Sequence, residues 1–192
     1  MGCWAFGVYQ SDDSMDWEGE LYEIAGLDHY EDDFDETAPA VRVALETALP
    51  KMLARLATSE AKPDMRTGYY KAVGYQMLAC VLMRHGCAVP DEARKVIIEG
   101  ILACPEYQMG KGLLAQAGAL TFTEELLRAN SINLGTRGFA GTVNRLTGRT
   151  SALERLAKEF GEYDAKGGTL YHYQDQGSLE LYGHSESETE TT

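Results

Sequence analysis

Apolar side chains recur every three to four residues along most of the chain, which is the spacing of amphipathic α-helices. Trp17, Leu21 and Ile24 form the first such face, and the third segment is apolar around much of its circumference. The sequence therefore predicts a mainly α-helical fold of five to seven helices packed around the third. The predicted helices span about residues 13–25, 39–56, 65–85, 90–104, 111–129 and 151–161.

Glycine, proline and capping residues mark the predicted helix ends. Gly26 and Gly86 are placed to end the first and third helices in the left-handed conformation. Pro50 falls inside the apolar pattern of the second helix and should kink or split it. Ser151 and Glu154 have the spacing of a capping box, which predicts the start of the last helix.

The C-terminal third breaks the helical pattern. Four glycines predict a loop with a short helix over about 142–146: Gly135, Gly138, Gly141 and Gly148. Residues 169–181 alternate around a turn at 175–177, which predicts a small β-hairpin. We thus expect an acidic helical domain over 1–130, a loop, helix and hairpin over 131–182 packed on it, and a disordered acidic tail over 183–192.

The net charge says more about function than the overall amino-acid composition does. The 192 residues carry a formal net charge of −13, and 44% of them are apolar, which suffices for a buried core. Residues 1–41 contain twelve acidic side chains and no Lys or Arg, and the tail adds Glu186, Glu188 and Glu190. An anionic surface of this kind repels nucleic acid and anionic membranes and attracts basic partners. General solubility is the alternative explanation.

Several classes of protein are disfavoured by what the sequence contains. No apolar run reaches the roughly 18 residues needed to span a bilayer, and the start does not resemble a signal peptide, so we expect a cytoplasmic protein without membrane contact. The four cysteines have no C-x-x-C spacing, and His85 with Cys87 is better explained as a helix end than as half a metal site. We expect no metal, no cofactor and no catalytic residues.

The opening of the chain resembles an uncharacterised, mostly bacterial family described as domain of unknown function 4259. The matching positions are Gly2, Trp4, Gly7, Tyr9, Asp12, Asp13, Asp16 and Trp17. The chain departs from the family pattern at Ala5 and Met15, while Pro90-Asp91-Glu92 matches a later turn. The resemblance covers roughly residues 1–105. It implies a small, acidic, helical protein and carries no catalytic residues.

The first functional hypothesis is a non-enzymatic acidic binding protein of the immunity or inhibitor type. Its acidic N-terminal face would bind a basic site on a protein partner, without direct contact to nucleic acid. The candidate partner-binding residues are Asp12, Asp13, Asp16, Glu20, Glu23, Asp28, Asp32, Asp33 and Asp35.

Two alternatives remain open. The Gly-rich basic segment could hold a phosphate or another anion through backbone amides and arginines, in a small-molecule-binding protein or an enzyme. Its candidate residues are Gly135, Arg137, Gly138, Arg145 and Arg149. The chain could instead be a structural subunit of a viral or bacterial assembly that uses the predicted hairpin and tail.

Overall fold

Six helices account for the secondary structure of the residues that the computed structural model describes, which are 12–29, 34–35, 38–59, 69–117 and 138–164. They are α1 (Asp12–Ile24), α2 (Pro39–Thr58), α3 (Tyr69–Arg84), α4 (Asp91–Leu102), α5 (Pro105–Ala117) and α7 (Gly138–Glu162). The prediction of a mainly α-helical chain is confirmed. The predicted β-hairpin and acidic tail lie outside the described residues, as do positions 1–11 of the family-like opening.

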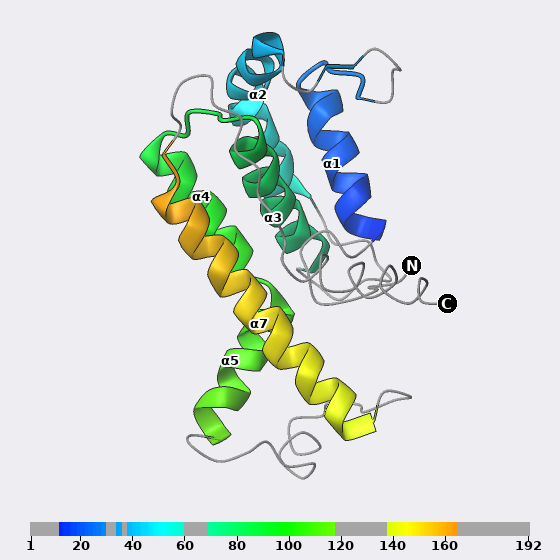
Figure 1. Cartoon of the computed structure of the whole chain (residues 1–192), viewed down its shortest axis with the longest axis vertical. Coiled ribbons are helices and arrows are strands. Elements are labelled where there is room, and N and C mark those ends of the chain that lie inside the picture. The colour runs from blue at the N-terminus through cyan, green and yellow to red at the C-terminus, as the bar shows by residue number, and fades with distance from the viewer. Residues whose placement is uncertain (1–11, 30–33, 36–37, 60–68, 118–137, 165–192) are drawn as a thin grey trace, which may run out of the picture.

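Helix α3 is the centre of the fold, as its all-round apolar pattern predicts. It runs between α1 and α4 in the upper part of the molecule (Figure 1). Only Tyr69, Lys71 and Arg84 among its residues are not buried. A helix with apolar side chains on every side buries them all only when other elements surround it. Helices α1, α2, α4 and α7 all pack on α3.

Glycines end α1 and α3 in the way the sequence predicts. Gly26 has a φ of 73° and Gly86 a φ of 64°, both in the left-handed region that glycine adopts without steric cost. At the end of α1, the Leu27 amide donates to the Tyr22 carbonyl and the Gly26 amide to the Glu23 carbonyl. This pattern satisfies carbonyls that the helix end leaves open.

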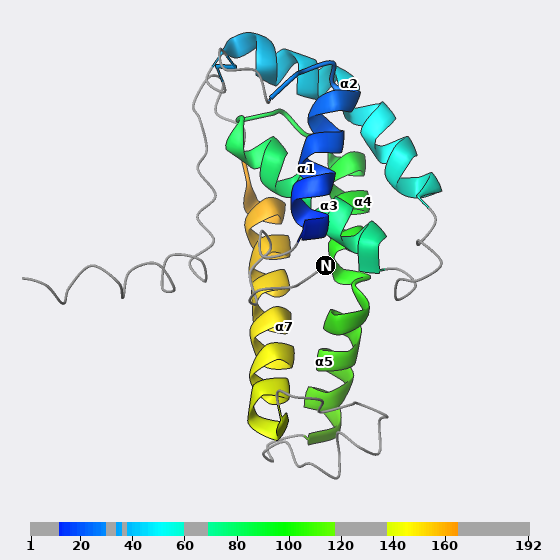
Figure 2. The ribbon, with the colours of Figure 1, turned by 90° about the vertical axis from the view of Figure 1, so that its right-hand side faces the viewer.

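Helix α2 continues through Pro50, so of the two predicted effects, a kink or a split, the split does not occur. Figure 2 shows α2 bending as it passes over the bundle, which is the effect expected of an internal proline. Pro50 itself is exposed, while Leu49 and Met52 beside it are buried. The buried neighbours hold both halves of the helix on the core, while the proline ring stays on the exposed side.

Helices α5 and α7 lie side by side and extend away from the bundle as a two-helix arm (Figures 1 and 2). The C-terminal half of α7 packs on α4 and its N-terminal half on α5. The two arm helices approach closely at Gly110, where a Cβ atom would lie only 2.1 Å from Thr150 Oγ1. Helix α5 begins at Pro105, six residues before the predicted start at 111.

The predicted loop and short helix are wrong over 138–150, because α7 is one continuous helix from Gly138 to Glu162, while positions 131–137 lie outside the described residues. Ser151 is therefore an exposed residue in mid-helix and caps nothing. Thr147 and Thr150 donate their hydroxyl hydrogens to the carbonyls of Val143 and Leu146, four residues earlier, so their side chains are satisfied within the helix. Packing against α4 and α5 then outweighs the low helix propensity of the glycines and threonines.

At its C-terminal end, α7 is held by Arg94 of α4. The guanidinium Nη1 donates to the carbonyls of Phe160 and Tyr163, at 2.5 and 2.8 Å, and the guanidinium carbon lies 5.6 Å from the Phe160 ring centroid. A cation at a helix C-terminus also interacts favourably with the helix dipole. None of the helices in the described ranges has the length and apolar character needed to cross a membrane.

Candidate functional site

Helix α1 separates its apolar and acidic side chains onto different faces. Trp17, Leu21 and Tyr22 are buried against the bundle, and the Trp17 indole Nε1 donates to the Tyr70 carbonyl at 2.8 Å. On the outward side, Asp16 and Glu23 are exposed and lie two helical turns apart. Met15 beside them is 51% exposed. We call Met15, Asp16 and Glu23, with the half-exposed Asp12, the acidic face.

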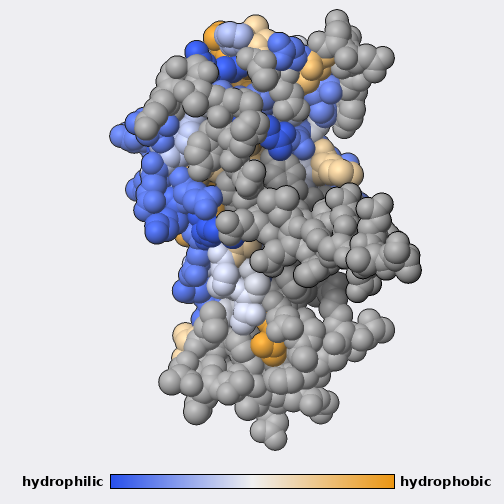
Figure 3. Space-filling view, in the orientation of Figure 1, coloured by the Kyte–Doolittle hydropathy of each residue, from blue (hydrophilic) through white to orange (hydrophobic). Residues whose placement is uncertain are grey.

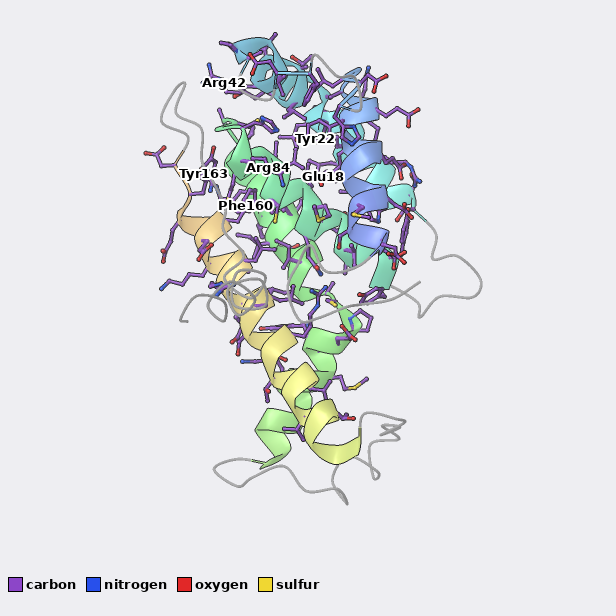
Figure 4. All side chains as sticks on the ribbon, turned by 45° about the vertical axis from the view of Figure 1, so that its right-hand side comes forward. Glu18, Tyr22, Arg42, Arg84, Phe160 and Tyr163 are labelled. Atoms are coloured by element: carbon purple, nitrogen blue, oxygen red, sulfur yellow. The ribbon has the colours of Figure 1, made fainter. Side chains whose placement is uncertain are left out.

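The flanks of α1 are neutralised by arginines of neighbouring helices. Glu18 Oε1 pairs with Arg84 Nη1 of α3 at 2.5 Å, and Figure 4 shows the two side chains pointing toward each other. Glu20 Oε1 pairs with Arg55 Nε of α2, also at 2.5 Å. The Arg55 guanidinium also lies over the Trp17 ring, 5.4 Å from its centroid. These pairs orient α1 and leave its outward side as the anionic surface.

The structure divides the predicted partner-binding residues into several groups. Asp16, Glu23, Asp28 and Asp35 are exposed, and Asp12 is half-buried. Asp13 is only 7% exposed, so it belongs to the start of α1 rather than to a docking surface. Glu20 is paired as described above. Asp32 and Asp33 lie outside the described residues.

The face formed by α4 and the C-terminal half of α7 provides a contrast. Figure 3 shows hydrophilic side chains gathered along this side of the molecule, at its left edge. Exposed residues of both signs alternate there, namely Asp91, Glu92, Lys95, Glu99, Glu154, Lys158 and Glu162. Mixed charges are typical of an ordinary solvated surface. The acidic face carries one sign only, since α1 contains no Lys or Arg.

The alternative anion site is not brought together in the described residues. Gly135 and Arg137 lie outside them, Gly138 begins α7, and the side chain of Arg145 is likewise outside them. Arg149 is only 2% exposed and points into the junction of α3, α5 and α7. Its Nη2 donates to Gln76 Oε1 at 2.7 Å, and its Nε lies 3.7 Å from Glu106 Oε2. Arg149 is therefore a buried ion-pair partner.

A buried polar pair between α1 and the end of α3 was not predicted from the sequence. Tyr22 Oη lies 2.7 Å from His85 Nε2, and the His29 ring stacks on Tyr22 at 4.8 Å between centroids. The only signal in the sequence was His85 next to a helix-ending glycine. Within the described ranges, no three His, Cys, Asp or Glu side chains gather in a way that could hold a metal ion.

Cys87 follows His85 and is fully buried. Burial raises the pKa of its thiol to about 12 from the ordinary 9.0, with a smaller contribution from Glu46. Its carbonyl accepts a hydrogen bond from Tyr163 Oη at 3.1 Å, and burial also raises the pKa of that phenol. A protonated, inaccessible thiol is a poor nucleophile, so Cys87 has a structural role.

We expect alkaline pH to destabilise the protein through Cys87. The unfolded thiol loses its proton near pH 9, whereas the folded thiol keeps it until about pH 12. The stabilisation is thus complete below pH 9 and is lost as pH rises through 12, at up to about 1.4 kcal/mol per pH unit. Urea unfolding from pH 8 to 11 should show this slope, and Cys87→Ala should make it shallower. An equally steep slope for the variant would contradict the assignment.

Comparison with protein-family models, with curated proteins and with solved structures found no match to this chain. The resemblance of its opening to domain of unknown function 4259 accordingly remains a sequence-based prediction.

Proposed function

We propose that this protein is a non-enzymatic binding protein whose acidic face docks on a basic site of a protein partner. One observation carries the proposal: the exposed side of α1 presents Asp12, Asp16 and Glu23 without any basic side chain on that helix. Single-sign surfaces steer oppositely charged partners and accelerate their encounter. The exposed Asp28 and Asp35 follow α1 in the chain and add to the same charge.

The internal arginines support this interpretation. Arg55 and Arg84 reach α1 from α2 and α3, yet they pair with Glu20 and Glu18 on its flanks. The two pairs fix the orientation of α1. Because both arginines pair with carboxylates on the flanks, they do not neutralise the acidic face. The exposed Met15 supplies an apolar contact within that charged surface, and apolar atoms at the centre of an interface contribute more affinity than charged atoms at its rim.

A basic protein site is the partner that this chemistry fits. Phosphate backbones and anionic lipids are repelled by carboxylates, whereas Lys- and Arg-rich surfaces pair with them. Proteins that bind nucleic acid carry such surfaces, so an immunity protein or inhibitor that covers the basic cleft of a nucleic-acid-handling enzyme is the function we favour.

The proposal is tested by reversing charge on the acidic face. We expect Asp16→Lys/Glu23→Lys to weaken binding of the native partner about 5- to 30-fold, since exposed ion pairs contribute about 0.2–1 kcal/mol each and reversal adds repulsion. Raising salt from about 50 mM to about 300 mM should weaken binding of the unmodified protein and have less effect on the variant. The measurement is capture of partners from the source organism, followed by titration of the captured protein.

The matched control is Glu92→Lys/Glu99→Lys on α4. It makes the same change in net charge at two exposed helical positions, seven residues apart as in the acidic face. We expect this control to retain the partner. Equal loss of binding in both variants would show that only net charge matters, and unchanged binding in the α1 variant would rule out the acidic face.

A further inference from the structure

The junction of α3, α5 and α7 contains a buried polar cluster that the proposed function does not use. Gln76 of α3 is 0% exposed, Glu106 of α5 is 5% exposed and Arg149 of α7 is 2% exposed. Arg149 connects the other two, through Nη2 to Gln76 Oε1 at 2.7 Å and through Nε toward Glu106 Oε2 at 3.7 Å. We call these three residues the junction cluster.

The orientation of the Gln76 amide follows from this contact. A guanidinium can only donate hydrogen bonds, so the Gln76 atom that faces Arg149 must be the carbonyl oxygen. The amide nitrogen Nε2 then points elsewhere in the buried junction. It is fully buried and makes no hydrogen bond to any residue in the described part of the chain. Leaving a buried donor unsatisfied is unfavourable because it has lost its hydrogen bonds to water, so a group that accepts its hydrogen is expected.

We infer that a water molecule is bound in the junction cluster, where it accepts a hydrogen bond from Gln76 Nε2 and donates one to the Glu106 carboxylate. The chemistry of the cluster selects water over an ion. A cation would meet the Arg149 guanidinium and the amide hydrogens, and an anion would meet Glu106. Water both accepts and donates, and buried water molecules in proteins make about three hydrogen bonds to polar groups of this kind.

This water connects the two-helix arm to the bundle. Gln76 belongs to the central helix, whereas Glu106 and Arg149 lie on the two arm helices. The 3.7 Å separation of Arg149 Nε and Glu106 Oε2 is longer than a hydrogen bond, and such pairs are commonly bridged by water. The bound water therefore completes a polar contact between the arm and the bundle.

The inference is tested by water–protein cross-relaxation in NMR spectra of the full chain labelled with ¹⁵N. We expect the Gln76 side-chain amide hydrogens, assigned through bonds from the Gln76 backbone, to show cross-relaxation with the sign of a long-lived water. The internal control is Gln108, which is exposed and donates its Nε2 hydrogen to the Leu102 carbonyl at 2.7 Å. Gln108 should show only rapidly exchanging water. A Gln76 amide without the long-lived signal would overturn the inference.

A second measurement locates the water by substitution. Gln76→Met keeps the length of the side chain and removes its amide, so relaxation dispersion of H₂¹⁷O should report one long-lived water fewer than in the unmodified protein. Gln108→Met should leave the amplitude unchanged. An unchanged amplitude in Gln76→Met would overturn the inference, and the spectrum of the unmodified protein decides the matter if this variant does not fold.

Discussion

Replacing Arg149 with methionine is expected to lower the free energy of unfolding by about 3–5 kcal/mol. The substitution takes the Arg149 guanidinium away from Glu106, a carboxylate that is only 5% exposed, and it removes the hydrogen-bond donor to Gln76 Oε1. Losing one member of a buried ion pair is costly because the remaining charge stays desolvated. Urea unfolding at neutral pH measures the change.

Two further variants show whether the loss of stability comes from the ion pair between Arg149 and Glu106. Arg149→Met/Glu106→Met removes both charges and should recover much of the loss, since apolar replacements of whole buried ion pairs are often neutral. Lys158→Met, at an exposed position of the same helix, should stay within about 0.5 kcal/mol of the unmodified protein. A double variant no more stable than Arg149→Met would show that Arg149 acts through packing and not through charge.

The outcome also bears on the phosphate-binding alternative. Of its three arginines, Arg149 is the one whose side chain lies in the described residues, and it faces inward. If removing Arg149 and Glu106 together restores stability, the role of Arg149 is to hold the arm on the bundle. The Gly-rich segment would then depend on Arg137 and Arg145 for any anion.

The first four helices could be predicted because their signals are local. Gly26 and Gly86 end α1 and α3 at positive φ, and Pro39 stands at the start of α2. The apolar positions of these helices repeat at helical spacing, and α1, α2 and α4 bury their apolar sides on α3. Such features depend on neighbours only a few residues away, so a single sequence contains them.

The C-terminal part of helix α7 was predicted over about 151–161, but its N-terminal half could not be predicted because the stability of that half comes from distant residues. Gly141, Gly148 and Thr150 weaken a helix taken alone. In the fold, Thr150 meets Gly110 of α5 and Arg149 meets Gln76 of α3, contacts that span 40 and 73 residues of sequence. Spacing within the segment therefore favoured a loop, whereas packing favours a helix.

The sequence predicted an acidic N-terminal region from its content of Asp and Glu. Only the structure shows which of these side chains are exposed. The sequence marked nine of the twelve early carboxylates as candidates. It could not show that Asp13 is buried, or that Glu18 and Glu20 are paired with Arg84 and Arg55. These pairings join helices 66 and 35 residues apart in sequence, so they depend on the tertiary arrangement.

Trp17→Ala is the second substitution with a large expected effect, about 3–5 kcal/mol of lost stability. Trp17 is 0% exposed, and its ring packs at a tilt against Tyr70 with centroids 4.9 Å apart. It lies so close to the backbone of α3 that a Cβ on Gly74 would be 2.7 Å from its Cε2. Thermal and urea unfolding should both report the loss.

Trp17→Phe separates packing from hydrogen bonding at this position. The phenyl ring retains most of the buried area and loses the 2.8 Å bond from Nε1 to the Tyr70 carbonyl, so we expect a cost of about 1–3 kcal/mol. The matched control is Met15→Ala, two residues away and 51% exposed, which should change stability by less than about 0.5 kcal/mol. Equal destabilisation by Met15→Ala and Trp17→Ala would mean that α1 also packs through its acidic face, which is the side proposed to bind the partner. The expected order, with Trp17→Ala worst and Met15→Ala nearly silent, requires that α1 be anchored by its aromatic side, which leaves Asp16 and Glu23 on the exposed side.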